Sequence, residues 1–220
     1  MPKPAEERVS KILAGRGICS RREADSYIER GWVRFANGDL VALGMQAAPD
    51  VEFILDPLAQ AAQGARVTIL LNKPVGYVSG QPEPGYEPAI TLITPERHFP
   101  GDRSNQVFSP SHLRGLAPAG RLDIDSHGLM ALTQDGTVAR RIIGEDSDVE
   151  KEYLVKIDGA LSEKDLALLN HGLILDGELL KPAQVHWAKP GQLRFVLRQG
   201  KKRQIRRMCE LVHVRVVDLK

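Results

Sequence analysis

The sequence has few of the features that mark secreted, membrane-spanning or metal-binding proteins. No apolar run approaches the roughly 18 residues that a membrane-spanning helix needs. Residues 1–8 are polar and contain no apolar segment like that of a signal peptide, so the cytoplasm is the expected location. The only two cysteines, Cys19 and Cys209, form no CxxC pair and no zinc set. We therefore expect two reduced, structural thiols and no metal site.

The net charge of only +2 excludes a globally basic, tail-like nucleic-acid binder. Positive charge is nevertheless clustered, at Arg21 and Arg22 and again in the segment 201–207, where five of the seven residues are basic. Because local patches set the field that a ligand meets, RNA remains a possible partner. The 220 residues, 42% of them hydrophobic, are enough for a small domain followed by a medium one.

Residues 7–55 are predicted to form a small unit of two helices and a short sheet. Ser20, followed three residues later by Glu23, has the capping-box pattern that begins a helix, here at about residues 21–30. The stretch 57–64 that follows is rich in alanine and glutamine. This composition is typical of a linker, and it is also compatible with a short helical turn.

The pattern changes to that of a larger α/β domain from about residue 66 onward. The proline-rich stretch 80–118 has little periodicity and is predicted to be a long surface excursion. Apolar alternation and helical spacing elsewhere predict strands at 67–71, 153–157 and 192–197 and helices at 162–169 and 204–211.

The segment 120–129 (GRLDIDSHGL) is the first candidate for chemistry. It places Asp123 between a strand-like approach and a glycine-containing loop, and such loops can hold a side chain at a fixed, exposed position. The plainer interpretation is that Asp125 and Ser126 cap the next element while Asp123 pairs with Arg121. Spacing alone does not choose between the two.

Two basic segments and one tyrosine are further candidates. In the predicted helix 204–211, Ile205 and Met208 have the spacing of a buried face, which would leave the basic residues to meet phosphate or water. Arg21 and Arg22 lie in the first turn of a helix, where the dipole disfavours cations and an anionic partner would favour them. Tyr153 begins a predicted strand, which by itself most often means packing.

Taken together and in this order, five motifs resemble one known family. The chain is similar to the RsuA-type pseudouridine synthases of bacterial ribosomal RNA, over nearly all of residues 9–219. Within that family it is most similar to the RluF branch, which acts on the large subunit. The motifs are GICSRREAD, LNKPVG, GRLDIDSHGL, KEYLV and GKKRQIRRM.

The resemblance implies an α/β (α+β) fold with two domains. Residues 1–57 correspond to a small helical RNA-binding domain like that of ribosomal protein S-four, and residues 58–66 to a linker. Residues 67–220 correspond to a catalytic domain built on a mixed, mainly antiparallel sheet. The family usually continues beyond the position of Lys220, so a truncated C-terminus is expected.

The resemblance also implies a function, the isomerisation of a specific uridine in large-subunit (23S) ribosomal RNA. The catalytic residues would be Asp123, Arg206 in a bidentate pair with it, and Tyr153 stacked on the uracil. The substrate would be a stem-loop with the uridine flipped out, and the enzyme a monomer without cofactor or metal, since the reaction needs no redox step. The expected RNA-binding residues are Arg21, Arg22, Arg121, Lys201, Lys202, Arg203 and Arg207.

Three other functions remain open at this point. One is the same chemistry on transfer RNA, which the sequence discriminates poorly. Another is a non-catalytic ribosome-assembly factor that only binds RNA, although such a protein has no need for Asp123, Tyr153 and Arg206 together. The third is a hydrolase with Asp123 and Asp125 as paired carboxylates.

Two positions differ from the family pattern: Gln199 stands where glutamate is common, and Ser126 stands where threonine is common.

Overall fold

The computed structural model describes residues 5–220, so the first four residues of the expected small domain lie outside the described residues. The chain divides into two compact units, each assembled from segments that are distant in sequence. The first consists of the described part of Met1–Ile69 with Gln106–Ala119 and Ala131–Arg141, and the second of Leu70–Asn105, Gly120–Met130 and Ile142–Lys220.

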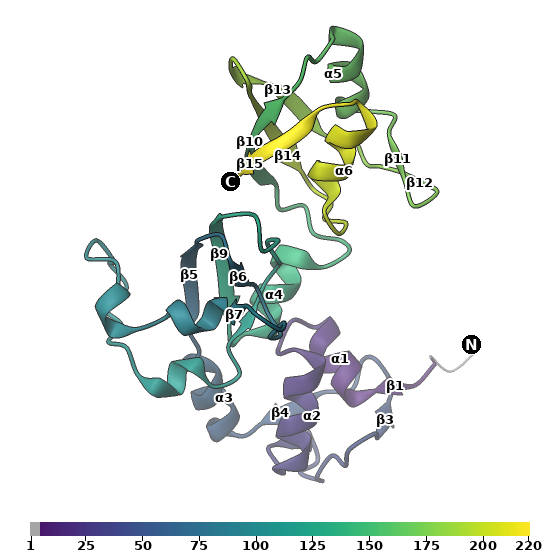
Figure 1. Ribbon diagram of the computed structural model, residues 1–220. Helices are drawn as coiled ribbons and strands as arrows, with labels where there is room; N and C mark the ends of the chain where they lie inside the picture. The colour runs from purple at the N-terminus through teal and green to yellow at the C-terminus, as the bar shows by residue number, and fades with distance from the viewer. Residues whose placement is uncertain (1–4) are drawn as a thin grey trace. The chain divides into compact units, whose positions relative to one another are not determined.

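The first unit begins with a pair of packed helices and two short antiparallel strand pairs (Figure 1). Ser20 caps the second helix as expected: its hydroxyl accepts from the Glu23 backbone N–H, and the Glu23 carboxylate accepts from the Ser20 N–H at 2.6 Å. This capping box confirms the predicted start of the helix. The elements are α1 (Val9–Gly15), α2 (Arg21–Glu29), β1 (Glu7–Arg8) paired with β3 (Gln46–Ala47), and β2 (Val33–Phe35) paired with β4 (Phe53–Leu55).

Most of the segment expected to be a linker is helix α3 (Pro57–Gly64). Asp56 caps it by accepting from the Leu58 N–H at 2.8 Å. Ala59 is fully buried in the same apolar cluster as α1 and α2, and the Gln63 side chain donates to the Ile18 carbonyl at 2.8 Å. The alanines therefore form a helix that packs against the small core, which removes the freedom of a flexible tether.

Arg66, just after α3, joins three segments of the first unit. Its guanidinium lies 2.9 Å from Glu23 Oε1 and 3.8 Å from Asp135 Oδ1, and it also donates to the Tyr27 hydroxyl. These side chains are mostly buried, so the contacts are screened less than those of surface ion pairs. Arg66 thus fixes α2 and the segment around Asp135 to the end of α3.

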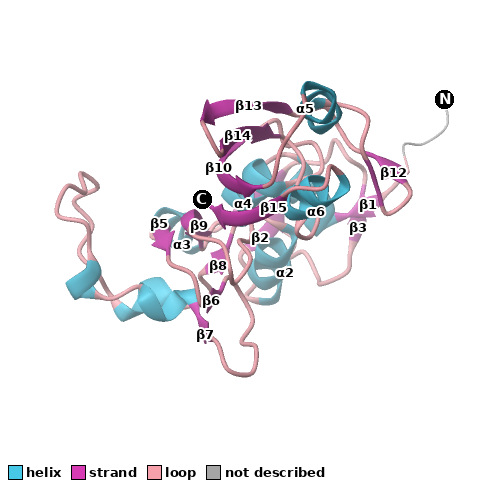
Figure 2. Ribbon diagram, turned by 45° about the horizontal axis from the view of Figure 1, so that its top comes forward, coloured by secondary structure: helices cyan, strands magenta, loops and turns pink. Residues whose placement is uncertain are grey.

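The second unit contains a four-stranded antiparallel sheet in the order β13-β14-β10-β15. Helices α5 and α6 lie beside it in both views (Figures 1 and 2). Leucine, valine and phenylalanine side chains from these elements form the core, with Phe195 fully buried. The elements are β10 (Lys151–Asp158), β13 (Gln184–Lys189), β14 (Gln192–Leu197), β15 (Arg215–Leu219), α5 (Glu163–Asn170), α6 (Gln204–Leu211) and the pair β11 (Ile174–Leu175)–β12 (Glu178–Leu179).

A second, three-stranded sheet has the order β5-β9-β8, and α4 follows it in the chain. The predicted excursion 80–118 is made of short turns and strands rather than long elements, and it buries Ala89 and Leu92. The elements are β5 (Thr68–Lys73), β6 (Tyr77–Val78) parallel to β7 (Glu87–Pro88), η1 (Ala89–Leu92), η2 (Pro95–Arg97), η3 (Pro110–Leu113), β8 (Ala117–Pro118), β9 (Gly128–Thr133) and α4 (Gly136–Ile143).

The fold is therefore mixed α/β with mainly antiparallel strand pairing, as expected. In the described part of the chain, no helix combines the length and apolar character needed to cross a bilayer.

Candidate active site

The loop that carries Asp123 is held on both sides of that residue. Before it, the Ser79 hydroxyl accepts from the Leu122 N–H at 2.9 Å and lies 2.6 Å from the Leu122 carbonyl, to which it donates. After it, the Ile124 carbonyl accepts from the Gly76 N–H at 2.8 Å. All of these residues belong to the second unit. The Asp123 side chain keeps 31% of its surface exposed, so it is fixed at its backbone and open at its carboxylate.

Arg206 is the buried cation of this site. Helix α6 places it there because Ile205 and Met208 are buried in the core, which confirms the predicted face. One terminal nitrogen of Arg206 donates to the Asp125 carbonyl at 2.9 Å and to the Ser126 hydroxyl at 3.2 Å.

The expected bidentate pair between Arg206 and Asp123 is not formed. Arg206 Nε lies 4.0 Å from Asp123 Oδ2 and is buried without a hydrogen-bond partner among the described residues. The physical reason is that the other end of the guanidinium is bound to the backbone of the Asp123 loop. Arg206 therefore acts on Asp123 through its positive charge, and its hydrogen bonds hold the loop in place.

The bidentate arginine–aspartate pair of the site joins Arg203 to Asp125. The two nitrogens of Arg203 lie 3.1 and 3.2 Å from the two oxygens of Asp125, and Arg203 Nη1 lies 3.8 Å from Asp123 Oδ2. Burial by itself raises the pKa of Asp125, but the hydrogen bond from Arg203 and the charges of Arg206 and Arg203 outweigh it, and the pKa is lowered. Arg203 was expected to contact phosphate; here its guanidinium is engaged within the site.

Lys73, at the end of β5, is a member of the site that the sequence did not single out. Its side chain is completely buried and donates to the carbonyls of Pro74 and Tyr77, both at 2.9 Å. Burial lowers the pKa of Lys73, and the charges of Asp123 and Asp125 act in the opposite direction. The sequence does place this lysine at the end of an apolar strand, directly before Pro74. It belongs to the motif LNKPVG, which was used only to establish the family resemblance.

Tyr153 lies in β10, in register with Phe195 of β14, and packs against the core of the second unit. Burial raises the pKa of its phenol, and the negative charge of Asp123 raises it further. The phenol is therefore neutral at ordinary pH and within electrostatic range of Asp123.

The other expected RNA-binding residues fall into two groups. Lys201 is paired with Glu178 at 2.6 Å, and Arg207 forms a bidentate pair with Asp176 at 2.6 and 3.0 Å. The remaining four are exposed and have no hydrogen bond or ion pair within residues 5–220: Arg21, Arg22, Arg121 and Lys202. The cations of the second group are therefore available to bind a ligand.

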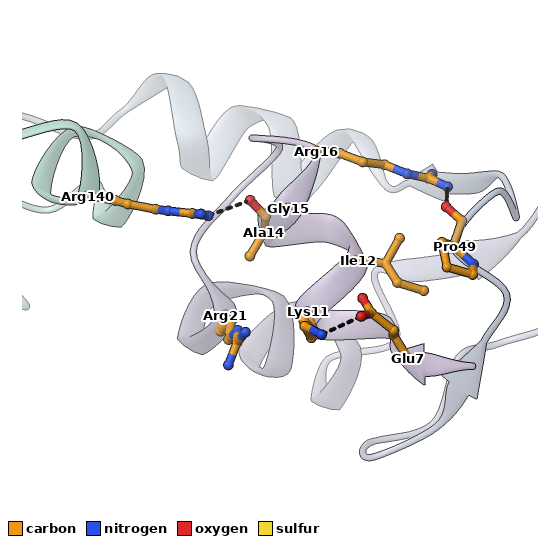
Figure 3. Close-up of a pocket in the computed structure, with 9 residues that line it drawn as sticks. All are labelled: Glu7, Lys11, Ile12, Ala14, Gly15, Arg16, Arg21, Pro49 and Arg140. Atoms are coloured by element: carbon orange, nitrogen blue, oxygen red, sulfur yellow. Dashed lines mark hydrogen bonds and ion pairs between the residues drawn. The ribbon is translucent and has the colours of Figure 1, made fainter. Parts of the chain in front are cut away.

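Arg21 also lines a pocket of about 290 Å³ in the first unit (Figure 3). Three further cations surround the pocket, and each is already bound to a neighbour. Lys11 is paired with Glu7, Arg16 donates to the Pro49 carbonyl at 2.7 Å, and Arg140 donates to the Ala14 carbonyl at 3.3 Å. The pocket is basic, with only one acidic residue in its lining.

Among the described residues, no group of three or more histidine, cysteine, aspartate or glutamate side chains is placed to hold a metal ion. Cys19 and Cys209 are buried thiols whose pKa values burial raises to about 12.

Comparison with known proteins identifies the family. Residues 67–211 match the family described as RNA pseudouridylate synthase. The chain is 38% identical over 205 residues to the dual-specificity RNA pseudouridine synthase RluF of Escherichia coli K12, covering 92% of this chain and 64% of that protein. It is 28% identical to the ribosomal large subunit pseudouridine synthase B of Pseudomonas aeruginosa, covering 94% and 52% of the two chains.

A solved structure supports the same relation. The crystal structure of a pseudouridylate synthase aligns with a TM-score of 0.62 at 25% identity, over 96% of this chain and 86% of that one. The chain spans less than two thirds of the length of the E. coli relative. On the family match over residues 67–211, the chain belongs to the RNA pseudouridylate synthase family.

Proposed function

We propose that this protein isomerises a specific uridine of large-subunit (23S) ribosomal RNA to pseudouridine, with Asp123 as the catalytic carboxylate. The observation that carries the proposal is the local geometry of Asp123. It is the carboxylate that the buried Arg206 faces without a hydrogen bond, on a loop fixed at the residues to either side. A carboxylate held in this way keeps its oxygen lone pairs for a substrate.

The reaction rearranges bonds within one nucleotide. The bond from ribose C1′ to uracil N1 breaks, a new bond forms from C1′ to uracil C5, and the proton on C5 is lost while N1 gains one. Asp123 acts either as a nucleophile at C1′ or as the base that takes a ribose proton. Both routes need an unprotonated Asp123 oxygen within reach of the sugar.

Tyr153 is proposed to stack on the flipped uracil. Because burial and the Asp123 charge raise the pKa of its phenol, the neutral form predominates, which favours stacking over proton abstraction by a tyrosinate. The unstacking of a uridine from a stem-loop costs a few kcal/mol, and an aromatic ring in the pocket offsets part of that cost.

The substrate assignment rests on the relatives. The Pseudomonas protein is named for the large ribosomal subunit, and RluF belongs to the branch that the motifs of this chain resemble. The E. coli relative is named a dual-specificity enzyme, which is compatible with a second RNA substrate, and transfer RNA is the alternative that the sequence left open. We propose that RNA phosphates are contacted by the exposed cations that are unpaired among the described residues, Arg21, Arg22, Arg121 and Lys202.

The test is a map of pseudouridine sites in total RNA from cells that lack the gene. The same map is then repeated after expression of the wild-type protein or of Asp123→Asn. We expect one site in 23S rRNA to vanish, to return with the wild type and to stay absent with the variant. If a site in transfer RNA is lost instead, transfer RNA is the substrate. If the deletion strain keeps every pseudouridine site, the protein is better explained as an RNA-binding assembly factor.

A further inference from the structure

The excursion predicted at residues 80–118 begins beside the proposed active site. The Ser79 hydroxyl, just before it, hydrogen-bonds both the N–H and the carbonyl of Leu122, the residue before Asp123. η1 then packs two side chains into the interior. From residue 95 to residue 105, in contrast, every residue is exposed. The second unit thus carries an exposed segment, 95–105, on an excursion that starts next to the Asp123 loop.

Phe99 lies on a tight turn in this segment. The Asp102 N–H donates to the Phe99 carbonyl at 3.0 Å, so Pro100 and Gly101 are the central residues of the turn. Proline restricts φ at that position, which favours the turn before any ligand binds. A Cβ atom added to Gly101 would lie 2.5 Å from Cε1 and 2.8 Å from Cζ of Phe99, so the ring packs against the turn. Phe99 is nevertheless 72% exposed, which leaves much of the ring open to a ligand.

Asp102 holds the turn together from within. Its carboxylate accepts from the N–H and the hydroxyl of Ser104 at 2.9 and 2.8 Å, and it lies 2.7 Å from His98 Nε2. The hydrogen bonds from His98 and Ser104 lower the pKa of Asp102 to about 2, so the carboxylate is ionised at neutral pH. A turn that is ordered in advance loses less conformational entropy when it binds a ligand.

Two arginines flank the turn, Arg97 on one side and Arg103 on the other, and both are exposed. Arg103 has no hydrogen bond or ion pair with any described residue. An aromatic ring beside cations is the combination that binds single-stranded nucleic acid, because the ring stacks on a base while the cations meet phosphates. A specific protein interface instead buries on the order of 1,000 Å² or more, which one ring does not supply. The chemistry of the turn therefore favours RNA over a protein partner.

We propose that Phe99 is a stacking platform for an unpaired base of the RNA substrate, with Arg97 and Arg103 beside the adjoining phosphates. This rests on the proposed function, because an RNA substrate extends well beyond the uridine at Asp123 and so can meet a segment that projects nearby. Phe99 touches no reacting atom. It contributes to the affinity for the RNA, and the rate of isomerisation in the bound complex does not depend on it.

The test follows pseudouridine formation in 23S rRNA from cells that lack the gene, under single-turnover conditions and over a range of protein concentrations. We expect Phe99→Ala to raise the half-saturating protein concentration roughly 5- to 150-fold, the usual range for the loss of one base–aromatic stack. The maximal rate should stay within about twofold of the wild type. Phe99→Leu keeps an apolar side chain without a ring and should bind as weakly as Phe99→Ala, whereas Phe99→Trp should bind at least as tightly as the wild type.

The salt dependence separates stacking from charge. Phe99→Ala should leave the slope of log K against log salt unchanged, because no phosphate contact is lost. Arg103→Gln should lower that slope by about one. If Phe99→Leu binds like the wild type, the contact needs no aromatic ring, and the proposal is overturned. Wild-type affinity of Phe99→Ala overturns it as well.

The fluorescence of Phe99→Trp reports stacking directly. The wild type already contains Trp32 and Trp187, so the RNA-dependent change of the variant is compared with that of the wild type. We expect additional quenching from the base that stacks on the new indole. If the wild type forms no pseudouridine, the proposed function fails, and the fluorescence with the same RNA still decides whether position 99 meets a base. An active wild type without additional quenching overturns only the stacking platform.

Trp187→Ala is the matched control. Trp187 is also an exposed aromatic residue, but it lies on β13, at the opposite edge of the four-stranded sheet from β15. It is β15 that contacts the Asp123 loop, because the His127 N–H donates to the Leu219 carbonyl at 3.1 Å. Trp187→Ala should therefore leave the half-saturating concentration unchanged. Equal weakening by Trp187→Ala and Phe99→Ala would show that exposed aromatic side chains bind RNA without regard to position, which contradicts the proposal.

Discussion

At the scale of single residues, we expect substitution of Lys73 to be destabilising. It is a completely buried ammonium whose two hydrogen bonds go to the carbonyls of Pro74 and Tyr77. Lys73→Met removes the donor of both hydrogen bonds, and the loss of a hydrogen bond typically costs roughly 0.5–1.5 kcal/mol. It also removes a positive charge that interacts with Asp123.

We therefore expect Lys73→Met to lower the urea midpoint of unfolding and the rate of modification together. Lys202→Met is the matched control for stability, because Lys202 is exposed and has no partner among the described residues. Its effect on the free energy of unfolding should stay within about 0.5 kcal/mol. Equal midpoints for the two variants would contradict the structural account of Lys73.

The residue scale also separates what the sequence can predict from what it cannot. The spacing of Ile205 and Met208 predicts the buried face of α6, because helical periodicity is a local property. The partner of Arg206 is not local. It depends on how the loop around Asp123 reaches α6, some 80 positions later in the chain. The family resemblance implied a bidentate pair of Arg206 with Asp123, whereas Arg206 Nε lies 4.0 Å from Asp123 Oδ2 and a terminal nitrogen of Arg206 donates to the Asp125 carbonyl and the Ser126 hydroxyl.

At the scale of elements, the start of α4 lies close to Ser20, the residue that caps α2. A Cβ atom added to Gly136 would lie 2.4 Å from the Ser20 Cβ and 2.7 Å from the Ser20 Oγ. Replacement of glycine by alanine in a helix ordinarily stabilises it by up to about 1 kcal/mol. Here we expect Gly136→Ala to lower the melting temperature instead, because the backbone must shift away from α2.

Gly64→Ala is the control for this substitution. Gly64 ends α3, has no positive φ and has no atom within 4 Å of an added Cβ. Its variant should melt at or above the wild-type temperature. A rise in the melting temperature with Gly136→Ala would show that α2 and α4 are not in contact as described.

Asp135, directly before α4, gives the first unit a dependence on acid. Its Oδ1 accepts from the Thr137 N–H at 2.8 Å and from the Thr137 hydroxyl at 2.7 Å. Burial by itself raises the pKa of Asp135, but the Thr137 hydrogen bonds and the Arg66 charge outweigh it and lower the pKa below 3.8. A lowered folded-state pKa stabilises the fold above the unfolded-state value, and this contribution is lost as the pH falls through the folded value.

We expect the urea midpoint of the wild type to fall as the pH is lowered below about 4. Asp135→Asn should have a lower midpoint at pH 7 and a smaller further decrease in acid, because it has no proton to gain. Identical pH profiles for the two proteins would mean that the charge of Asp135 does not stabilise the fold.

Most of the helices and strands can be predicted from local sequence patterns. The capping box at Ser20 and Glu23 predicts the start of α2, and alternation predicts β14 at the residues where it occurs. The segment 57–64 is different, because its composition is compatible with both a linker and a helix. The contacts of Ala59 and Gln63 with the small core decide in favour of α3.

At the scale of the whole molecule, the division into two units could not be predicted from the sequence. The first unit takes in Gln106–Ala119 and Ala131–Arg141, which are separated from the small helices by many residues. Such contacts depend on tertiary packing, and the periodicity of a single sequence does not reveal which distant segments pack together. A deletion of residues 1–57 would therefore cut through a packed unit, and point substitutions are the better probe of RNA binding.

Arg21 and Arg22 are the first choice for such substitutions. Both are exposed and unpaired in the described part of the chain, so a phosphate contact would be their main source of stabilisation. Each replacement by alanine should weaken RNA binding and lower the slope of log K against log salt by about one, with little effect on the rate once RNA is bound. Arg215→Ala, which removes a 77% exposed arginine paired with Asp158, should change neither. Unchanged slopes for both arginines would place the RNA elsewhere.

The central claim is that Asp123 carries out the isomerisation. The most direct measurement uses purified wild-type protein and Asp123→Asn, each bound to the same extent to ribosomal RNA from cells that lack the gene, and follows pseudouridine at the target site over time. The account predicts formation with the wild type and none with the variant, although both bind the RNA. Formation of pseudouridine by Asp123→Asn at a rate near that of the wild type would contradict it.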